Sequence, residues 1–102
     1  MAKRLTTTKG RAVVITTEWR GVFFGYVADD SDAPTKIVLT DARMCNYWSR
    51  DVKGVLGLAA NGPTQGCRIG PKVPSFEAWK ITAIINCTDN AVTAWEGAPW
   101  GQ

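Results

Sequence analysis

The sequence predicts a mainly β protein of the α+β class: a small antiparallel sheet or partly open barrel of about five strands, with one short C-terminal helix. Three segments within the first 41 residues alternate β-branched or aromatic residues as strands do, and the last segment changes to helical spacing. At 102 residues, 45% of them hydrophobic, the chain has the size and composition of a single folded domain. We therefore expect a flexible basic tail over residues 1–10 and one β-rich domain over residues 11–102.

The first two strands are expected in "RAVVITTEW" and "RGVFFGYVA", joined by a turn at the shared Trp-Arg-Gly. Successive side chains of a strand point to opposite faces of its sheet. Val13 and Ile15 should therefore share one face, and Phe24 and Tyr26 should lie on the face opposite Phe23. This spacing predicts two adjacent strands, each with apolar residues on both faces.

Four later segments complete the expected sheet. "TKIVLTD" follows the turn-forming "DDSDAP" and is predicted as a third strand. "GVLGLAA" and "GCRIGP" are each long enough for a short strand or a tight crossing, between glycines and prolines typical of loops. "EAWKITAIINC" is predicted as one continuous strand, central in the sheet because both of its faces are partly apolar.

The C-terminal segment has the signals of a short helix. Thr88 is a suitable N-cap, and Ala91, Val92 and Trp95 fall on one face at helical spacing. Gly97 and the proline two residues later should end the helix. Because two turns of helix are not stable alone, this face should pack on the sheet.

The formal net charge of +3 is unevenly distributed. Lys3, Arg4, Lys9 and Arg11 lie in the first eleven residues, where there is no acid, and the remainder holds eight basic and nine acidic residues. The domain is therefore nearly neutral, and specific nucleic-acid binding is not expected of it. The tail is either a solvated terminus or a segment that touches phosphate backbones through counterion release.

Cysteine and histidine usage limits the chemistry. The three cysteines, Cys45, Cys67 and Cys87, occur singly, and there is no histidine, so a structural zinc site is not expected, and neither is any cofactor. An odd thiol count without a secretory leader predicts a reducing, cytoplasmic location. No apolar run approaches the roughly 20 residues of a membrane span.

Catalysis is not predicted. Neither a Ser-His-Asp nor a Cys-His arrangement can form without histidine, although a carboxylate-based enzyme stays open as an alternative. The stretch "GLAANGPT" has phosphate-loop spacing, but Pro63 stands where the phosphate-binding lysine belongs. We interpret it as a turn in which Gly62 takes a positive φ.

The stretch "ARMCNYWSRDVK" contains the candidate ligand site, because aromatic rings there lie close in sequence to cations. Rings stack on nucleobases, and guanidinium groups hold phosphates in two-pronged contacts. In the alternative interpretation the rings are buried and the arginines pair with Asp41 and Asp51; for Trp48 alone burial is the expectation. The candidate ligand-binding residues are Arg43, Tyr47, Trp48, Arg50, Lys53 and Arg68.

Five tryptophans in so short a chain exceed the needs of its core. Aromatic residues are favoured in the cores of interfaces, and small sheets have edges that a second subunit can cover. We therefore expect a homo-oligomer, with Trp100 near the C-terminus as the leading interface residue.

The segments "LTDARMCNYWS", "KGVLGLAANGP", "GCRIGPKVPS" and "AVTAWEGAPW" resemble a domain-of-unknown-function family encoded in phages, prophages and bacterial genomes. The resemblance extends from about residue 11 to 100, and the family has no established catalytic residues to transfer. A phage context implies an accessory protein that counters host defence. We therefore expect a protein that binds and sequesters a nucleotide-derived immune signal, or alternatively one that inhibits a host defence enzyme through an aromatic patch.

Overall fold

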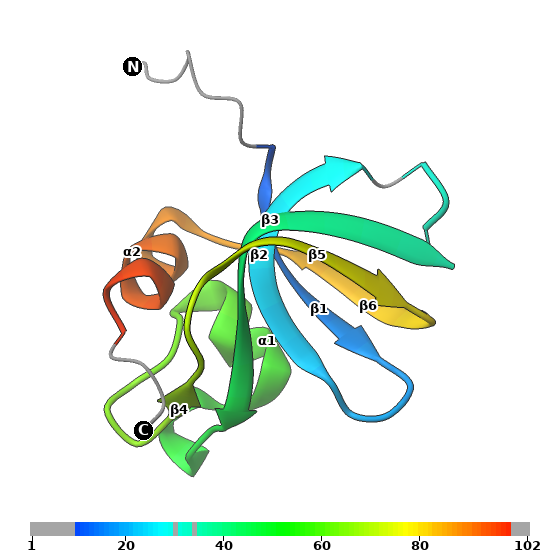
Figure 1. Cartoon of the computed structure of the whole chain (residues 1–102). Helices are drawn as coiled ribbons and strands as arrows, with labels where there is room; N and C mark the ends of the chain where they lie inside the picture. The colour runs from blue at the N-terminus through cyan, green and yellow to red at the C-terminus, as the bar shows by residue number, and fades with distance from the viewer. Residues whose placement is uncertain (1–9, 30, 34, 99–102) are drawn as a thin grey trace.

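The computed structural model describes residues 10–29, 31–33 and 35–98, and it confirms the predicted mainly β fold (Figure 1). Three strands come first, then a 3-10 helix and a short α-helix, then three more strands and the last helix. The elements are β1 Ala12–Thr17, β2 Val22–Asp29, β3 Lys36–Tyr47, the 3-10 helix η2 Arg50–Val52, α1 Gly54–Ala60, β4 Arg68–Ile69, β5 Val73–Trp79, β6 Ile81–Asn86 and α2 Asp89–Gly97.

The sheet is antiparallel and strongly curved. Its path runs β4-β3-β2-β1-β6, and β5 pairs with the first part of β3. Strands β5 and β6 therefore lie at opposite edges, yet Lys80 alone joins them. Because a single residue spans only a few ångströms, the two edges must approach each other at this end. The result is the open, barrel-like roll seen in Figure 1, in which β5 and β6 form no ladder within the described residues.

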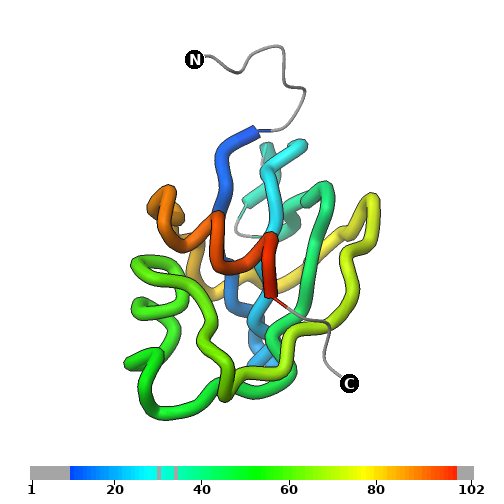
Figure 2. The backbone as a smooth tube through the Cα atoms, turned by 90° about the vertical axis from the view of Figure 1, so that its left-hand side faces the viewer, coloured from blue at the N-terminus to red at the C-terminus, as the bar shows by residue number. Residues whose placement is uncertain are grey.

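Apolar side chains form one core on each face of the sheet. The inner core lies within the roll and includes Val13, Ile15 and Leu39, with Phe23 packed against it. The helix-side core lies between the sheet and α1 and α2; it includes Val14, Phe24, Tyr26, Leu58 and Trp95. Figure 2 shows both helices on the same side of the strands. The predicted faces of β1 and β2 are thus confirmed.

A β-bulge in β3 changes which face its residues occupy. Phe24 pairs with Arg43 and Tyr26 with Thr40, so Asp41 and Ala42 together oppose the single residue Gly25. Asp41 has a φ of 50°, which is left-handed. Residues 43 and 45 consequently face the helices, and residue 44 faces the opposite side next to Phe23.

Helix α2 begins and packs as predicted. Thr88 is its N-cap, and the Thr88 hydroxyl accepts a hydrogen bond from the Ala91 amide at 3.1 Å. Trp95 is fully buried, stacks on Phe24 with ring centroids 5.1 Å apart, and donates its indole N–H to the Leu58 carbonyl at 3.0 Å. The short helix is therefore held by the sheet on one side and by α1 on another.

The segment "GVLGLAA" forms helix α1, so the prediction of a strand or crossing there was wrong. An apolar run of this length is too short for periodicity to separate strand from helix. Close packing decides the outcome: a Cβ on Gly57 would lie 1.5 Å from the Val52 carbonyl oxygen, and Leu58 is fully buried. The predicted turn that follows is confirmed, since Gly62 has a φ of 83°.

The segment "EAWKITAIINC" forms two strands, so the prediction of one central strand was also wrong. Lys80 has a φ of 58°, donates its amide to the Thr35 carbonyl at 2.9 Å and accepts from the Glu18 amide at 3.2 Å. It thereby links the start of β3 to the end of β1 and turns the chain from one sheet edge to the other. Strand β6 is an edge strand whose apolar residues face the two cores.

Candidate ligand-binding site

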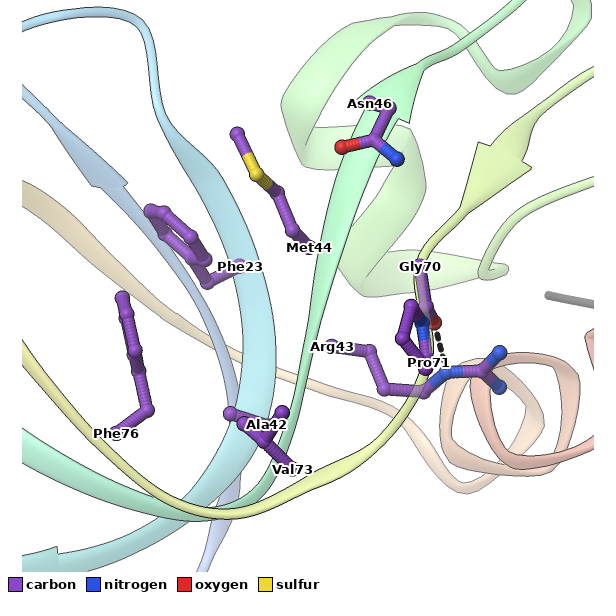
Figure 3. A pocket seen from close by; sticks show the side chains of 9 residues that line it. All are labelled: Phe23, Ala42, Arg43, Met44, Asn46, Gly70, Pro71, Val73 and Phe76. Carbon is purple, nitrogen blue, oxygen red and sulfur yellow. Dashed lines mark hydrogen bonds between the residues drawn. The ribbon is translucent and has the colours of Figure 1, made fainter. Parts of the chain in front are cut away.

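An apolar hollow of about 310 Å³ lies where β2, β3 and β5 approach one another (Figure 3). We call it the apolar hollow. Most of its wall is hydrocarbon, and two polar side chains reach it, Arg43 and Asn46. Its lining residues are Phe23, Ala42, Arg43, Met44, Asn46, Gly70, Pro71, Val73 and Phe76.

Two phenylalanines form one end of this hollow. The rings of Phe23 on β2 and Phe76 on β5 have centroids 4.6 Å apart and are tilted by 34°. Met44 is opposite Phe23 in the ladder and is 42% exposed, and Val73 is 39% exposed. Apolar side chains left this accessible around a concavity favour the binding of a flat, apolar group.

At the other end of the hollow, the Asn46 carboxamide is a polar group that a ligand can contact. It lies near the end of β3 and is exposed, and Figure 3 shows its carboxamide near the rim beside Gly70. The carboxamide forms no hydrogen bond with another described residue. One N–H₂ donor and one C=O acceptor are therefore free to meet a ligand.

Arg43 lines the hollow with its backbone and stem, and its guanidinium points away from Phe23, toward α2 (Figure 3). Its Nε donates to the Gly70 carbonyl at 2.8 Å, and its Nη1 donates to the Trp95 carbonyl at 2.6 Å. The residue is 2% exposed, and burial lowers the pKa of the guanidinium from its usual value. Arg43 thus anchors α2 and the β4–β5 connection to β3.

Glu96, Tyr26 and Lys72 form a cluster of charged and polar side chains near the guanidinium of Arg43. Glu96 on α2 accepts a hydrogen bond from the Tyr26 hydroxyl and forms an ion pair with Lys72 at 2.5 Å. Burial raises the pKa of Tyr26, and the hydrogen bond to Glu96 adds to the shift. This ion pair links Lys72, which lies between β4 and β5, to helix α2.

A second, open hollow adjoins the first at Asn46. It has a volume of about 410 Å³ and is lined by Asn46, Tyr47 and Arg68. Tyr47 and Arg68 are partners in the ladder between β3 and β4, and Tyr47 is 54% exposed. Arg68 is exposed and forms no ion pair or hydrogen bond with another described residue. Asn46 therefore lines both the apolar hollow and the hollow that Arg68 lines.

The other predicted site residues do not line the hollow that holds Tyr47 and Arg68, although the Arg43 stem lines the apolar hollow. Trp48 is half-buried against the helix-side core. Arg50 and Lys53, in and just after η2, are exposed and line neither hollow. Trp100, the expected interface residue, lies outside the described residues, and the expected homo-oligomer stays a prediction.

The loop that carries Arg50 is held by side chains. Asp51 accepts hydrogen bonds from the Ser49 and Thr64 hydroxyls, the latter at 3.0 Å. These bonds hold the pKa of the Asp51 carboxyl below its usual value. Asp51 therefore fixes residues 49–52 against the start of the loop that leads to β4.

Sequence reasoning missed the phenylalanines, Met44, Val73 and Asn46. Asn46 lies inside the stretch predicted as the site, but that prediction rests on the aromatic rings and cations of the stretch. Phe23 was placed on the correct face. No local signal pairs it with Phe76, because the two residues are 53 positions apart in the chain.

The nearby thiol is a poor nucleophile. Cys45 is buried, and burial, followed by the effect of Cys67, raises its pKa to about 12. At neutral pH it therefore stays protonated, and the thiolate is the reactive form. Among the described residues no three His, Cys, Asp or Glu side chains gather as a metal site, and none of their helices is long and apolar enough to cross a membrane.

Fold and site together define a small β-rich domain with two surface hollows that share Asn46, one lined mostly by apolar side chains and the other by Tyr47 and Arg68 as well. The chain belongs to the family named domain of unknown function DUF6948, whose model matches residues 10–95. No curated protein and no solved structure matches the chain.

Proposed function

We propose that this protein binds and sequesters a small anionic molecule that contains a nucleobase, and releases it chemically unchanged. The supporting observation is the junction at Asn46 between the apolar hollow and the hollow that holds Arg68. A base is flat and largely apolar on its faces, and its phosphate is an anion. A nucleotide therefore has the two chemical parts that these two hollows accommodate.

Stacking and charge contribute to binding in this proposal at separate places. The Phe23 and Phe76 wall receives the base, and burying apolar surface there stabilises the complex. Arg68 meets the phosphate in a charge-assisted contact, with Tyr47 beside it. Cys45 keeps its proton, and no nucleophile is assigned to either hollow.

The biological context of the proposal is a phage or prophage protein that acts in the host cytoplasm. It rests on the resemblance of the sequence to phage-encoded proteins. A sequestering protein that removes a nucleotide-derived immune signal counters host defence by mass action, so it needs affinity and abundance and no turnover.

Thermal melts with a panel of linear and cyclic nucleotides test the proposal. Ligand at about 100 times its dissociation constant adds roughly 2.7 kcal/mol of stability, which raises the melting temperature by several degrees. Arg68→Ala should weaken binding about tenfold or more, because a charge-assisted hydrogen bond is lost. Arg50→Ala removes the same charge outside both hollows and should leave binding unchanged.

Recovery of the ligand distinguishes storage from turnover. Nucleotide released by heat from the complex should be identical to the nucleotide added. The absence of any thermal shift across the panel, or conversion of the ligand, would contradict the proposal.

A separate surface favours a second candidate, inhibition of a partner protein. Trp19 in the β1–β2 turn is 86% exposed, and Trp79 at the end of β5 is 55% exposed. Their turns are neighbours, because the Glu18 amide donates to the Lys80 carbonyl. The Lys36 ammonium lies 5.5 Å from the centroid of the Trp79 ring, and tryptophan is enriched among interface hot spots.

The second candidate is tested with Trp19→Ala and Trp79→Ala. These variants should lose co-purification with a host protein and keep any thermal shift with nucleotides. Retention of the host protein by the double variant would remove this candidate.

A further inference from the structure

We infer that Asn46 selects adenine, so that the captured ligand is an adenine nucleotide. This inference rests on the proposed function and deepens it by naming the base. It follows from counting the polar groups that the apolar hollow can offer to a bound base.

Among the side chains that line the hollow, the Asn46 carboxamide is the polar group that makes no hydrogen bond with another described residue. It offers its N–H₂ donors and its carbonyl acceptor to a bound base. The backbone of Gly70 also reaches the hollow, but its carbonyl accepts from Arg43 at 2.8 Å and its amide donates to the Met44 carbonyl at 2.8 Å. The remaining lining side chains, apart from Arg43, are hydrocarbon or thioether.

Adenine matches this supply. Its exocyclic amine and a neighbouring ring nitrogen form a donor and acceptor pair, and a carboxamide satisfies both at once. Guanine presents a carbonyl next to a ring N–H and an exocyclic amine. Cytosine adds a carbonyl to its donor and acceptor pair, and uracil presents two carbonyls and no exocyclic amine. Each additional group placed against Phe23, Met44 or Phe76 loses its water without gaining a partner, which lowers affinity.

The position of Asn46 supports the same assignment. It lines both hollows, so a base whose edge meets the carboxamide can have its ring on the Phe23 side and its phosphate on the Arg68 side. The bulge at Asp41 produces this arrangement, because it places residue 44 toward the hollow while residues 43 and 45 face the helices. Asn46 is thus a specificity-determining residue in this scheme.

Titration calorimetry with AMP and GMP on the full chain tests the inference, because the two ligands share their phosphate. The wild type should bind AMP at least tenfold more tightly than GMP. Asn46→Asp offers acceptors only, which suit the two adjacent N–H groups of guanine, so the preference should fall below threefold or reverse. Asn46→Ala should also reduce the preference below threefold.

Asn90→Asp is the matched control. It makes the same chemical change on the exposed first turn of α2, outside both hollows, and should keep the tenfold preference. Circular dichroism of each variant verifies that the fold is retained.

The outcomes separate this inference from the proposed function. If the wild type binds AMP and GMP with equal affinity, or if Asn46→Asp keeps the full preference for AMP, Asn46 does not select the base and the inference is overturned, while nucleotide capture stands. If the wild type binds no nucleotide, the proposed function fails and the inference fails with it.

Discussion

Arg43 on β3 donates a hydrogen bond from Nη1 to the backbone carbonyl of Trp95 on α2, across 2.6 Å. The same guanidinium holds the Gly70 carbonyl through Nε at 2.8 Å. One side chain thus ties the end of the sheet to the C-terminal helix and to the segment that forms the rim of the apolar hollow. We expect it to serve the fold more than the ligand.

Arg43→Met should therefore destabilise the protein by roughly 2–4 kcal/mol, because two buried carbonyls lose their donors. Urea unfolding measures the change. Arg50→Met, on the exposed 3-10 helix, should cost less than about 0.5 kcal/mol. Equal midpoints for the two variants would show that the buried bonds contribute nothing.

Substitutions of Asp41 test how much its left-handed backbone conformation in the bulge matters for stability. At its φ of 50° a β-branched side chain is strained, so Asp41→Val should lower the free energy of unfolding by about 1–3 kcal/mol. Asp41→Gly should be destabilised much less, since glycine adopts this conformation freely. Thermal denaturation of the pair gives the comparison. A less stable glycine variant would mean that the Asp41 carboxylate matters more than its backbone.

The buried thiol of Cys45 predicts a loss of stability in alkali. Its folded-state pKa is raised to about 12 from an ordinary value of 9.0, because burial disfavours the thiolate. The native state therefore favours the neutral thiol, and this contribution is complete below pH 9 and declines as pH rises toward 12. Unfolding free energy should drop by roughly 1–2 kcal/mol between pH 8 and 10.5.

Comparison of variants isolates this contribution. Cys45→Ala should show a clearly smaller alkaline drop in urea titrations at the two pH values, and Cys67→Ala should keep most of it. Cys87, whose pKa burial raises to about 11, adds to the drop in every variant that retains it. An unchanged drop in Cys45→Ala would assign the effect to other groups.

Gly70→Ala tests whether the apolar hollow is the ligand site. A Cβ there would lie 3.6 Å from the Met44 carbonyl oxygen and 3.7 Å from Asn46 Nδ2, which is ordinary contact. The fold should tolerate the methyl group, while AMP affinity in calorimetry should fall at least fivefold because the group takes space beside Asn46. Gly97→Ala, where a Cβ meets nothing within 4 Å, should bind as the wild type does. Full affinity in Gly70→Ala would place the ligand elsewhere.

Strand alternation was enough to predict the faces of β1 and β2, and helical spacing with an N-cap residue was enough to predict α2. Phe23 and Phe24 separate into different cores, as strand periodicity requires, and Thr88 caps α2 through its hydroxyl. These features depend on residues close together in the sequence. A single amino-acid sequence is therefore enough to predict them.

The bulge and the turn at Lys80 could not be predicted in the same way. Both depend on single residues in the left-handed region, Asp41 and Lys80, within segments that otherwise have strand composition. Once the bulge shifts the alternation by one residue, Arg43 moves to the helix side. A guanidinium that sequence reasoning gave to a phosphate then donates to backbone carbonyls.

Two of the six predicted ligand-binding residues lie side by side in the structure, and their role stays a prediction. Tyr47 and Arg68 are brought together by the short ladder between β3 and β4, and sequence reasoning named both. The wall they adjoin is made by Phe23 and Phe76 from strands far apart in the chain. Such a wall exists only after the sheet has rolled, so composition and spacing carry no sign of it.

The most direct test of the proposed ligand site is a titration of the full chain with AMP, followed by two-dimensional NMR of its amide and methyl groups. Saturable changes in chemical shift should appear at Phe23, Met44, Asn46 and Phe76, and at Arg68 where the phosphate binds. The signals of Trp19 and Trp79 should not move. An absence of shifts, or shifts confined to Arg50 and Lys53, would contradict the assignment of these two hollows as the ligand site.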